Sequence, residues 1–231
     1  MAYARTMPSE PLKLDLPNGE AVSALWQAPP APKAVLSLAH GAGAGMTHRH
    51  MTAIADGLEA RGVATLRFQF PYMEKGSKRP DAPPVAHVAV RAAAAEAARR
   101  ADGAPLFAGG RSFGARMTSQ TQAVTPLEKV CGLVFFAFPL HPAGKPGIER
   151  ADHLAKVAVT MLFLQGTADT LAQLDLLRAV TSDLGDRAKL ILAEDADHAF
   201  HVPARTGRKD TEVMDKLLDE AAGWITSALP G

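Results

Sequence analysis

Residues 109–115 read Gly-Gly-Arg-Ser-Phe-Gly-Ala and contain the pattern Gly-x-Ser-x-Gly, with Ser112 at its centre. The pattern follows the apolar run Pro105–Ala108 and precedes Phe113–Val124, which can form a helix. A serine on a sharp strand-to-helix turn takes strained backbone angles, so the residues two before and two after it must lack side chains. Both glycines meet that need, and the stretch therefore predicts a strand, a tight turn and a helix, with the serine at the turn.

Short apolar runs alternate with helix-like segments on both sides of this turn. Continuous apolar runs are typical of buried parallel strands, and the alternation predicts an α/β fold with a mainly parallel, doubly wound sheet. The expected strands are Ala34–Ala39, Val63–Phe68, Pro105–Ala108, Val130–Phe138, Val157–Gln165 and Ala188–Ala193, and the expected helices are Thr47–Arg61, Val85–Ala101, Phe113–Val124, Leu171–Leu184 and Asp210–Leu229.

The amino-terminal part differs from this alternation. Leu12–Leu16 and Ala21–Trp26 flank Pro17-Asn18-Gly19, and Asn-Gly between two alternating runs is a strong signal for a β-hairpin. We therefore expect an antiparallel hairpin to open the fold.

The length of 231 residues suits one large domain. We expect residues 1–10 to form a flexible N-terminus and residues 11–231 to form a single domain. A separate lid domain would need more room than the irregular stretch Pro139–Lys156 provides, so no large lid domain is expected.

Composition argues against several classes of protein. Lys and Arg number 25 against 24 Asp and Glu, so the chain lacks the basic excess that nucleic-acid binders use. The longest apolar run, Val130–Phe138, is about half of what a membrane-spanning helix needs. The single cysteine, Cys131, permits no internal disulfide, and a reducing, cytoplasmic location fits this best.

Ser112 needs a base to remove its proton, and the base needs a carboxylate to orient it. Asp169 follows the expected strand Val157–Gln165, and His198 follows Ala188–Ala193. Each of the three residues then lies at the carboxyl end of a strand, in the order Ser, Asp, His. Asp195 and Asp197 are alternative acids, but they would need the chain to fold back sharply on the histidine.

The glycine-rich stretch His40–Gly45 follows the first expected parallel strand. We expect it to form an oxyanion hole, with one backbone N–H from Ala42 or Gly43 and another from Phe113. A nucleotide site is the weaker interpretation because neither phosphate-binding glycine pattern is complete. His48 and His50 have a spacing that could chelate a metal, but no carboxylate cluster completes a site, so neither metal nor cofactor is expected.

Longer stretches carry a resemblance to a known family. Residues 40–51 (HGAGAGMTHRHM), 109–117 (GGRSFGARM), 161–171 (MLFLQGTADTL) and 195–203 (DADHAFHVP) resemble the α/β-hydrolase superfamily. Within it they look like the small dienelactone-hydrolase-like family, which includes the testis-expressed hydrolase-like proteins and a subunit of a chromatin-acetylating complex. The resemblance implies the α/β-hydrolase fold and an esterase activity. It departs from true dienelactone hydrolases in having serine rather than cysteine as the nucleophile.

The sequence thus predicts a serine hydrolase that cleaves a small ester or thioester through Ser112, His198 and Asp169. Arg111, Tyr72 and His141 are candidate substrate contacts, and they would favour an anionic acyl or phosphate-bearing substrate if they converge. The alternative is a protein-interaction scaffold on a hydrolase fold, with slow or vestigial activity. Nucleic acid and membrane are not expected partners, and the oligomeric state stays open.

Overall fold

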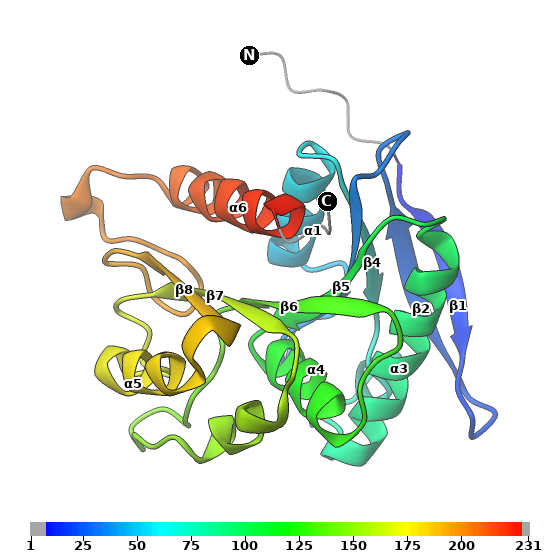
Figure 1. Cartoon of the computed structure of the whole chain (residues 1–231), viewed down its shortest axis with the longest axis horizontal. Coiled ribbons are helices and arrows are strands. Elements are labelled where there is room, and N and C mark those ends of the chain that lie inside the picture. Colours follow the sequence, from blue (N-terminus) through cyan, green and yellow to red (C-terminus); the bar gives the residue numbers. More distant parts are fainter. Residues whose placement is uncertain (1–7, 228–231) are drawn as a thin grey trace.

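The structure, a computed structural model, describes residues 8–227. Its core is one eight-stranded sheet in the order β1-β2-β4-β3-β5-β6-β7-β8 (Figure 1). From β4 to β8 across the sheet, neighbouring strands are parallel, as the apolar runs predict. The strands are β1 (Glu10–Asp15), β2 (Ala21–Gln27), β3 (Ala34–Ala39), β4 (Val63–Phe68), β5 (Leu106–Arg111), β6 (Val130–Phe136), β7 (Thr160–Gly166) and β8 (Ala188–Ala193).

The expected amino-terminal hairpin is confirmed. β1 and β2 pair antiparallel around the Asn18-Gly19 turn, and β2 also pairs antiparallel with β4. β1 begins at Glu10, which pairs with Trp26, so the sheet starts one residue before the expected domain boundary. Residues 1–7 of the expected N-terminal segment lie outside the described residues, as do residues 228 and 229 at the end of the last expected helix.

Helices cover both faces of the sheet, which makes the fold doubly wound (Figure 1). Helices α1 and α6 lie on one face, and α3, α4 and α5 lie on the other. Each face has its own cluster of buried apolar side chains, with α1 and α6 residues in one and α3 and α4 residues in the other. The helices are α1 (Arg49–Glu59), α2 (Pro71–Glu74), α3 (Pro83–Arg100), α4 (Phe113–Val124), α5 (Leu174–Leu184) and α6 (Asp210–Ser227), with short 3-10 helices η1 (Glu149–Lys156), η2 (Gly185–Arg187) and η3 (Ala204–Thr206).

Several strand ends differ from the expected runs: β7, for example, starts at Thr160 rather than at Val157. Two of these differences, in β5 and β6, have clear physical reasons. β5 continues through Gly109 to Arg111 because a glycine pairs in a strand without adding to the apolar pattern, and a Cβ at Gly109 would overlap the Val134 carbonyl of β6. β6 ends at Phe136 although the apolar run continues, because the chain turns at Ala137, where φ is +56°. The apolar run reports burial here rather than strand conformation.

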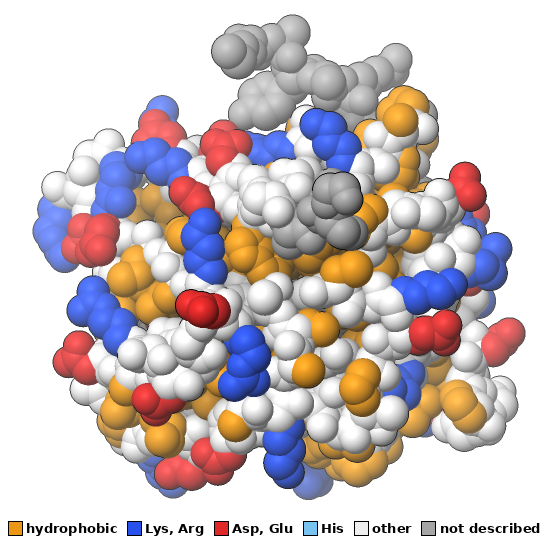
Figure 2. Space-filling view, in the orientation of Figure 1, with side chains coloured by type: hydrophobic (Ala, Val, Ile, Leu, Met, Phe, Trp, Pro, Cys, Tyr) orange, Lys and Arg blue, Asp and Glu red, His pale blue; other side chains and the backbone are white. Residues whose placement is uncertain are grey.

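The irregular stretch between β6 and β7 carries only η1, so the described part of the chain, residues 8–227, holds no large lid domain there. Within residues 8–227, no helix combines the length and the apolar character needed to cross a membrane. On the face shown in Figure 2, basic and acidic side chains are interspersed, in keeping with the net charge of +1.

Candidate active site

Ser112 lies at the turn between β5 and α4, with φ +52° and ψ −116°. Its backbone N–H donates to the carbonyl oxygen of Phe136 at 3.0 Å, which ties the turn to the end of β6. A Cβ at Gly110 would lie 2.5 Å from the carbonyl oxygen of Ala39, and a Cβ at Gly114 would meet the same atom. The expectation that both glycines are needed for close backbone approach is therefore confirmed.

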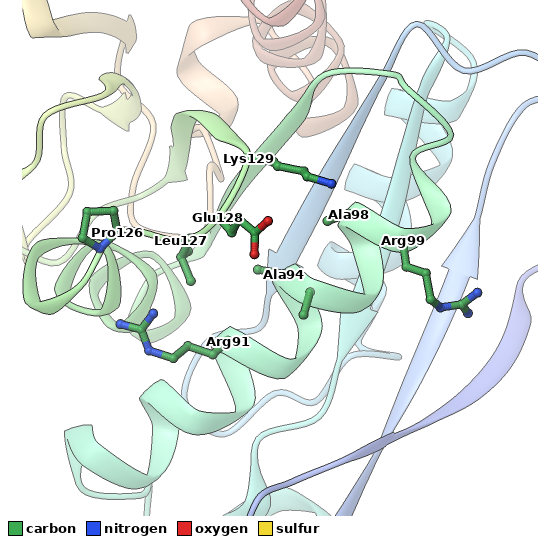
Figure 3. Close-up of a pocket in the computed structure, with 9 residues that line it drawn as sticks. Arg91, Ala94, Ala98, Arg99, Pro126, Leu127, Glu128 and Lys129 are labelled. Atoms are coloured by element: carbon green, nitrogen blue, oxygen red, sulfur yellow. The ribbon is translucent and has the colours of Figure 1, made fainter.

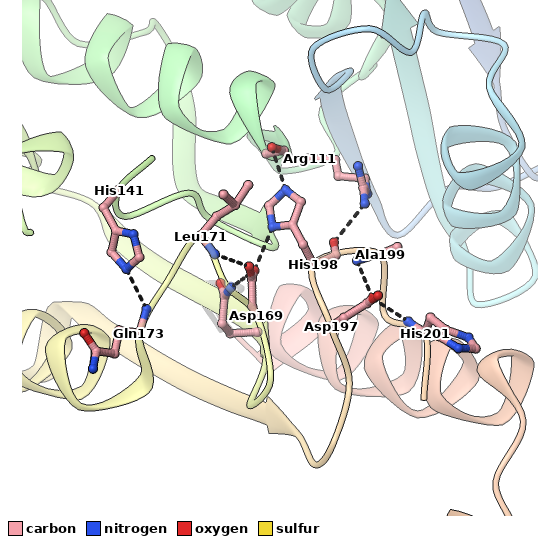
Figure 4. Close-up of polar contacts among 11 residues, drawn as sticks. Arg111, His141, Asp169, Leu171, Gln173, Asp197, His198, Ala199 and His201 are labelled. Carbon is pink, nitrogen blue, oxygen red and sulfur yellow. Dashed lines mark hydrogen bonds and ion pairs between the residues drawn. The ribbon is translucent and has the colours of Figure 1, made fainter. Parts of the chain in front are cut away.

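The side chains of Ser112, His198 and Asp169 form one hydrogen-bonded chain. His198 Nδ1 lies 2.7 Å from Asp169 Oδ2, and His198 Nε2 lies 2.8 Å from Ser112 Oγ (Figure 4). A carboxylate can only accept, so Nδ1 is the ring nitrogen that carries the proton and Nε2 accepts from the serine hydroxyl. The structure thus brings together the three residues that the sequence names.

Two further donors hold the Asp169 carboxylate. The side-chain amide of Gln165 donates to Oδ2, and the backbone N–H of Leu171 donates to Oδ1 at 2.8 Å. Asp169 is 4% exposed, so these bonds replace the water that its buried carboxylate gives up. Sequence reasoning missed Gln165, because its apolar neighbours mark only a buried strand end and not the direction of its amide.

The two alternative acids make other contacts. Asp197 Oδ1 accepts from the backbone N–H groups of Ala199 and His201, and so stabilises its own turn (Figure 4). Asp195 pairs with Arg208 at 3.1 Å. The imidazole of His198 therefore bonds to Asp169 rather than to either of them.

The guanidinium of Arg111 has a hydrogen-bond partner within the protein. Its Nη2 donates to the carbonyl oxygen of His198 at 2.8 Å, which links the end of β5 to the histidine loop (Figure 4). Burial lowers the pKa of Arg111 from its usual value, and the nearby Asp169 and Asp197 act in the opposite direction. The geometry gives Arg111 a positioning contact with the loop that carries His198.

His141 is 3% exposed and joins two loops at the same edge of the sheet. Its Nδ1 lies 2.9 Å from the carbonyl oxygen of Pro142, and its Nε2 accepts from the backbone N–H of Gln173 at 2.9 Å (Figure 4). Both ring nitrogens are used, so a contact with substrate would require one of these bonds to break.

The glycine-rich loop after β3 is held by a neutral histidine. His40 Nδ1 donates to the carbonyl oxygen of Gly41 at 2.8 Å, and Nε2 accepts from the backbone N–H of Phe70 at 3.0 Å. Burial lowers the pKa of His40 to about 4. His40 therefore ties this loop to the segment that follows β4.

The loop passes close to the serine. A Cβ at Gly41 would lie 3.6 Å from Ser112 Cβ. Within residues 8–227, the backbone N–H groups of Ala42 and Phe113 donate to no protein acceptor, whereas the N–H of Gly43 lies beside the Tyr72 hydroxyl. Two backbone N–H groups, one directly after Ser112 and one in the loop beside it, thus have no acceptor among the described residues.

Tyr72 is 3% exposed and packs behind the glycine-rich loop. Its ring lies 6.4 Å from the ring of Phe70 and 6.2 Å from that of Phe113. Burial is the main cause of a raised pKa at its hydroxyl. The residue forms part of the wall behind the loop. Within residues 8–227, the side chains of Arg111, Tyr72 and His141 make no hydrogen bond or ring contact with one another.

The H-x-H pair has a local role at the start of α1. His48 Nδ1 accepts from the backbone N–H of His50 at 3.3 Å, so His48 caps the helix. Across residues 8–227, no group of three His, Cys, Asp or Glu side chains is arranged to hold a metal ion.

A pocket of about 470 Å³ lies between α3 and the segment from α4 to β6 (Figure 3). Ala94 and Ala98 contribute to its floor, and Arg91 and Lys129 lie at its rim. It opens where β6 begins, whereas Ser112 follows the carboxyl end of the parallel strand β5. The pocket therefore lies at the edge of the sheet opposite the candidate active site.

A second pocket, of about 610 Å³, lies between α1 and α6. Met214 and Leu218 contribute apolar wall, and Phe200 brings in the loop that carries His198. Ser112 is not among the residues that line this pocket.

Comparison with known proteins adds the family to this geometry. Residues 32–226 match the family described as alpha/beta hydrolase domain, from the linker before β3 into the last turn of α6. The chain belongs to the alpha/beta hydrolase domain family. Ser112, Asp169 and His198 all lie inside the matched part of this alpha/beta hydrolase.

Solved structures with the same fold cover almost the whole alpha/beta hydrolase chain. A dienelactone hydrolase from Anabaena variabilis has 16% identity and a TM-score of 0.77, with 98% of this chain and 100% of that one covered. A serine hydrolase without a lid from Xanthomonas campestris has 23% identity and a TM-score of 0.72, with 99% of each chain covered. An alpha-beta serine hydrolase homologue from Coxiella burnetii has 19% identity and a TM-score of 0.72, with 98% and 100% covered. At these identities the similarity establishes the fold.

Proposed function

We propose that the protein is a serine hydrolase that cleaves a small ester or thioester through an acyl-enzyme. The observation that supports this most is the continuous hydrogen-bonded chain from Ser112 Oγ through His198 to Asp169. A serine hydroxyl at a strained turn, an imidazole in hydrogen-bond contact with it and a buried carboxylate together form the arrangement that activates serine. Family membership and the serine hydrolase neighbours favour the same chemistry.

In the proposed reaction, His198 Nε2 takes the proton of Ser112 as Oγ attacks the substrate carbonyl. Asp169 keeps the imidazole in the required tautomer and stabilises the imidazolium. Collapse of the tetrahedral intermediate breaks the bond to the leaving group, which takes the proton from His198. Water then attacks the acyl-enzyme by the same route and releases the acid and the free serine.

The negative oxygen of the intermediate needs donors that are already in place. The Phe113 N–H, directly after Ser112, is one proposed donor, and the Ala42 N–H is the other. Ala42 is preferred over Gly43 because the Gly43 N–H lies beside the Tyr72 hydroxyl.

The substrate is proposed to be a small molecule, and the lone Cys131 supports a cytoplasmic location. Membership of this chain in the narrower dienelactone-hydrolase-like family stays a prediction from the sequence.

The test is covalent labelling with a fluorophosphonate, followed by intact mass. Wild type is expected to gain one adduct, Ser112→Ala to gain none, and His198→Ala to react slowly because the hydroxyl has lost its base. Ser182→Ala is the matched control: Ser182 is exposed on α5, far along the chain from the site, and its loss should leave labelling unchanged.

Absence of an adduct on folded wild type would contradict the proposal. That result would favour the scaffold alternative, and pull-down of partners would follow. Labelling that persists in Ser112→Ala would show that another nucleophile reacts. A panel of esters and thioesters then separates the two substrate classes by kcat/KM.

A further inference from the structure

Arg116 is a half-buried cation with no anionic partner. It lies on the first turns of α4, and its side chain makes no ion pair or hydrogen bond with any residue from 8 to 227. Its Nε is fully buried and unpartnered. Burial lowers the pKa of Arg116, and its charged neighbour Arg150 acts in the same direction. A guanidinium taken from water normally gains a carboxylate or several acceptors in return, and Arg116 has neither.

Other polar atoms around Arg116 are also unsatisfied. α4 packs against α3 and η1, and these elements bring His87, Gln120 and His153 to the same place. His87 Nε2 and Gln120 Oε1 are buried and have no well-aligned hydrogen-bond partner, and the two side chains lie within hydrogen-bonding reach of each other. His153 Nε2 lies 2.7 Å from Ser119 Oγ. We call this group, Arg116 with His87, Gln120, Arg150 and His153, the Arg116 cluster.

The Arg116 cluster contains two arginines and no carboxylate. Burial lowers the pKa of His87, and burial together with Arg116 lowers the pKa of His153 to about 4, so both rings are neutral near pH 7. The cluster thus presents a net positive charge and neutral donors, with no negative group to balance them. An anion of suitable size would accept from the Arg116 guanidinium and balance its charge.

The cluster begins one helical turn after the proposed nucleophile. The Arg116 N–H donates to the carbonyl oxygen of Ser112 at 3.2 Å, so Arg116 closes the first turn of α4 directly after the residue that caps this helix. Four residues of helix correspond to a rise of about 6 Å, and helical side chains lean toward the amino-terminal end. Arg116 therefore leans toward Ser112 and can meet a group a few bonds beyond a carbonyl that is attacked there.

We propose that the Arg116 cluster is an anion-binding subsite that selects substrates with a carboxylate a few bonds beyond the cleaved ester carbonyl. This rests on the proposed serine hydrolase activity and adds to it the class of substrate. It assigns the binding of the substrate's negative charge to Arg116 rather than to Arg111, because the Arg111 guanidinium already donates to the carbonyl oxygen of His198. Arg116, unlike Arg111, has a guanidinium with no protein acceptor within the described residues.

The kinetic test compares two activated esters with six-carbon acyl chains. The 4-nitrophenyl half-ester of adipate carries a terminal carboxylate, and 4-nitrophenyl hexanoate does not. Arg116→Gln is expected to lower kcat/KM for the adipate half-ester about 10- to 100-fold, as loss of a charge-assisted hydrogen bond does, with less than about a threefold change for the hexanoate. Arg116→Lys keeps the charge and should recover part of the loss.

Arg178→Gln is the matched control. Arg178 is exposed on α5, and its removal subtracts the same charge without touching the Arg116 cluster. It should leave the ratio of the two kcat/KM values unchanged. The proposal would be overturned if Arg116→Gln lowered kcat/KM by the same factor for both esters. It would also be overturned if Arg178→Gln changed the ratio of the two kcat/KM values as much as Arg116→Gln does.

A second measurement does not depend on catalysis. Calorimetric titration of Ser112→Ala with adipate should show binding, and the Ser112→Ala, Arg116→Gln double variant should bind at least about tenfold more weakly. If wild type takes no fluorophosphonate adduct but adipate still binds through Arg116, the hydrolase proposal fails and the anion subsite stands. If labelling succeeds and adipate does not bind at millimolar concentration, the anion subsite fails and the hydrolase proposal stands.

A purely structural role for Arg116 predicts a different pattern. It would make Arg116→Gln less stable, and both esters would lose activity together. Because Arg116 has no counter-ion within residues 8–227, we expect its replacement by Gln to leave the Tm unchanged or raise it slightly.

Discussion

Of the six non-glycine residues with positive φ in residues 8–227, four flank the candidate active site and two, Asp102 and Lys129, lie elsewhere. Ser112 has φ +52°, and Asp195 and Phe200, on either side of His198, have φ +57° and +63°. Ala137, after β6, has φ +56°. Such angles cost free energy in residues other than glycine and persist only where surrounding contacts enforce them. The contacts described above, from Phe136 to Ser112 and across the His198 turn, are of that kind.

At the same scale, Asp169→Asn tests the role of the carboxylate. Asn can present an N–H to His198 Nδ1, which would put the ring proton on Nε2 and leave no acceptor for the Ser112 hydroxyl. We expect the rate of fluorophosphonate labelling to fall by about 10³- to 10⁴-fold, with the Tm close to that of wild type. Asp195→Asn is the control and should label at the wild-type rate. If Asp169→Asn is labelled at the wild-type rate, the Asp169 carboxylate has no role in activating Ser112.

Arg111 provides a second prediction about a single side chain. Arg111→Met keeps the length of the stem but removes the bond to the carbonyl of His198. We expect kcat for a neutral ester to fall about tenfold with little change in KM, because the histidine loop loses its anchor while the substrate keeps its contacts. A rise in KM with unchanged kcat would instead indicate that Arg111 binds substrate directly.

Among the elements, the β5–α4 connection depends on close contact with the end of β3. The glycines around Ser112 bring backbone against the Ala39 carbonyl, and Thr118 Oγ1 donates to the Gly109 carbonyl at 3.1 Å from inside α4. β7 and the histidine loop are joined in a similar way: a Cβ at Gly166 would overlap the Ala196 carbonyl. Close packing of backbone against backbone thus sets the distances between the elements that carry the site.

Two glycine substitutions are expected to change the free energy of unfolding in opposite directions, one at a close backbone contact and one in open space. Gly114→Ala places a Cβ on the backbone of β3, which cannot move without shifting the sheet, so we expect a loss of more than about 3 kcal/mol or failure to fold. Gly223→Ala lies in α6, where a Cβ would meet nothing within 4 Å, and should raise the free energy of unfolding by about 0.5 to 1 kcal/mol. Urea denaturation measures both. A stable Gly114→Ala protein would contradict the assigned geometry.

At the scale of the whole molecule, one sheet separates two apolar cores. Two histidines, His40 and His153, connect loops and helices that pack around this sheet. His40 joins the glycine-rich loop to the segment after β4, and His153 joins η1 to α4. Burial is the main cause of the lowered pKa, about 4, of both rings. Their protonation therefore couples the stability of the whole fold to pH.

The direction of this coupling follows from proton counts. Between pH 6.5 and 4 the unfolded chain binds protons at His40 and His153 that the folded protein does not, so the free energy of unfolding falls as the pH falls through that window. His40 alone contributes a slope of about 1.4 kcal/mol per pH unit there. Urea midpoints between pH 4 and 7.5 measure the decline, and His153→Gln should make it shallower.

His201→Gln is the control for this titration. His201 is exposed, and its hydrogen bond to Asp210 raises its pKa, so its contribution is present at low pH and is lost as the pH rises. Replacing it should therefore not flatten the decline toward pH 4. If His153→Gln and wild type lose stability in parallel, then His153 is not held neutral in the folded protein.

The sequence by itself determined the hairpin, the alternation of strands and helices and the strand-to-helix turn at Ser112, because apolar periodicity and glycine requirements are local properties. It also named the three side chains that meet at the candidate site, since parallel strands bring their carboxyl ends to one edge. It named Arg111 and His141 as candidate substrate contacts, and the structure supplies the protein atoms to which each of them bonds.

Only the tertiary structure decided that Gln165 holds the Asp169 carboxylate and that Arg116 is left without an anion among the described residues. The directions of these side chains depend on register, on rotamers and on how closely the backbones approach. A linear pattern reports whether a position is buried, but a hydrogen bond needs two atoms placed within about 3 Å, and packing in three dimensions sets that distance.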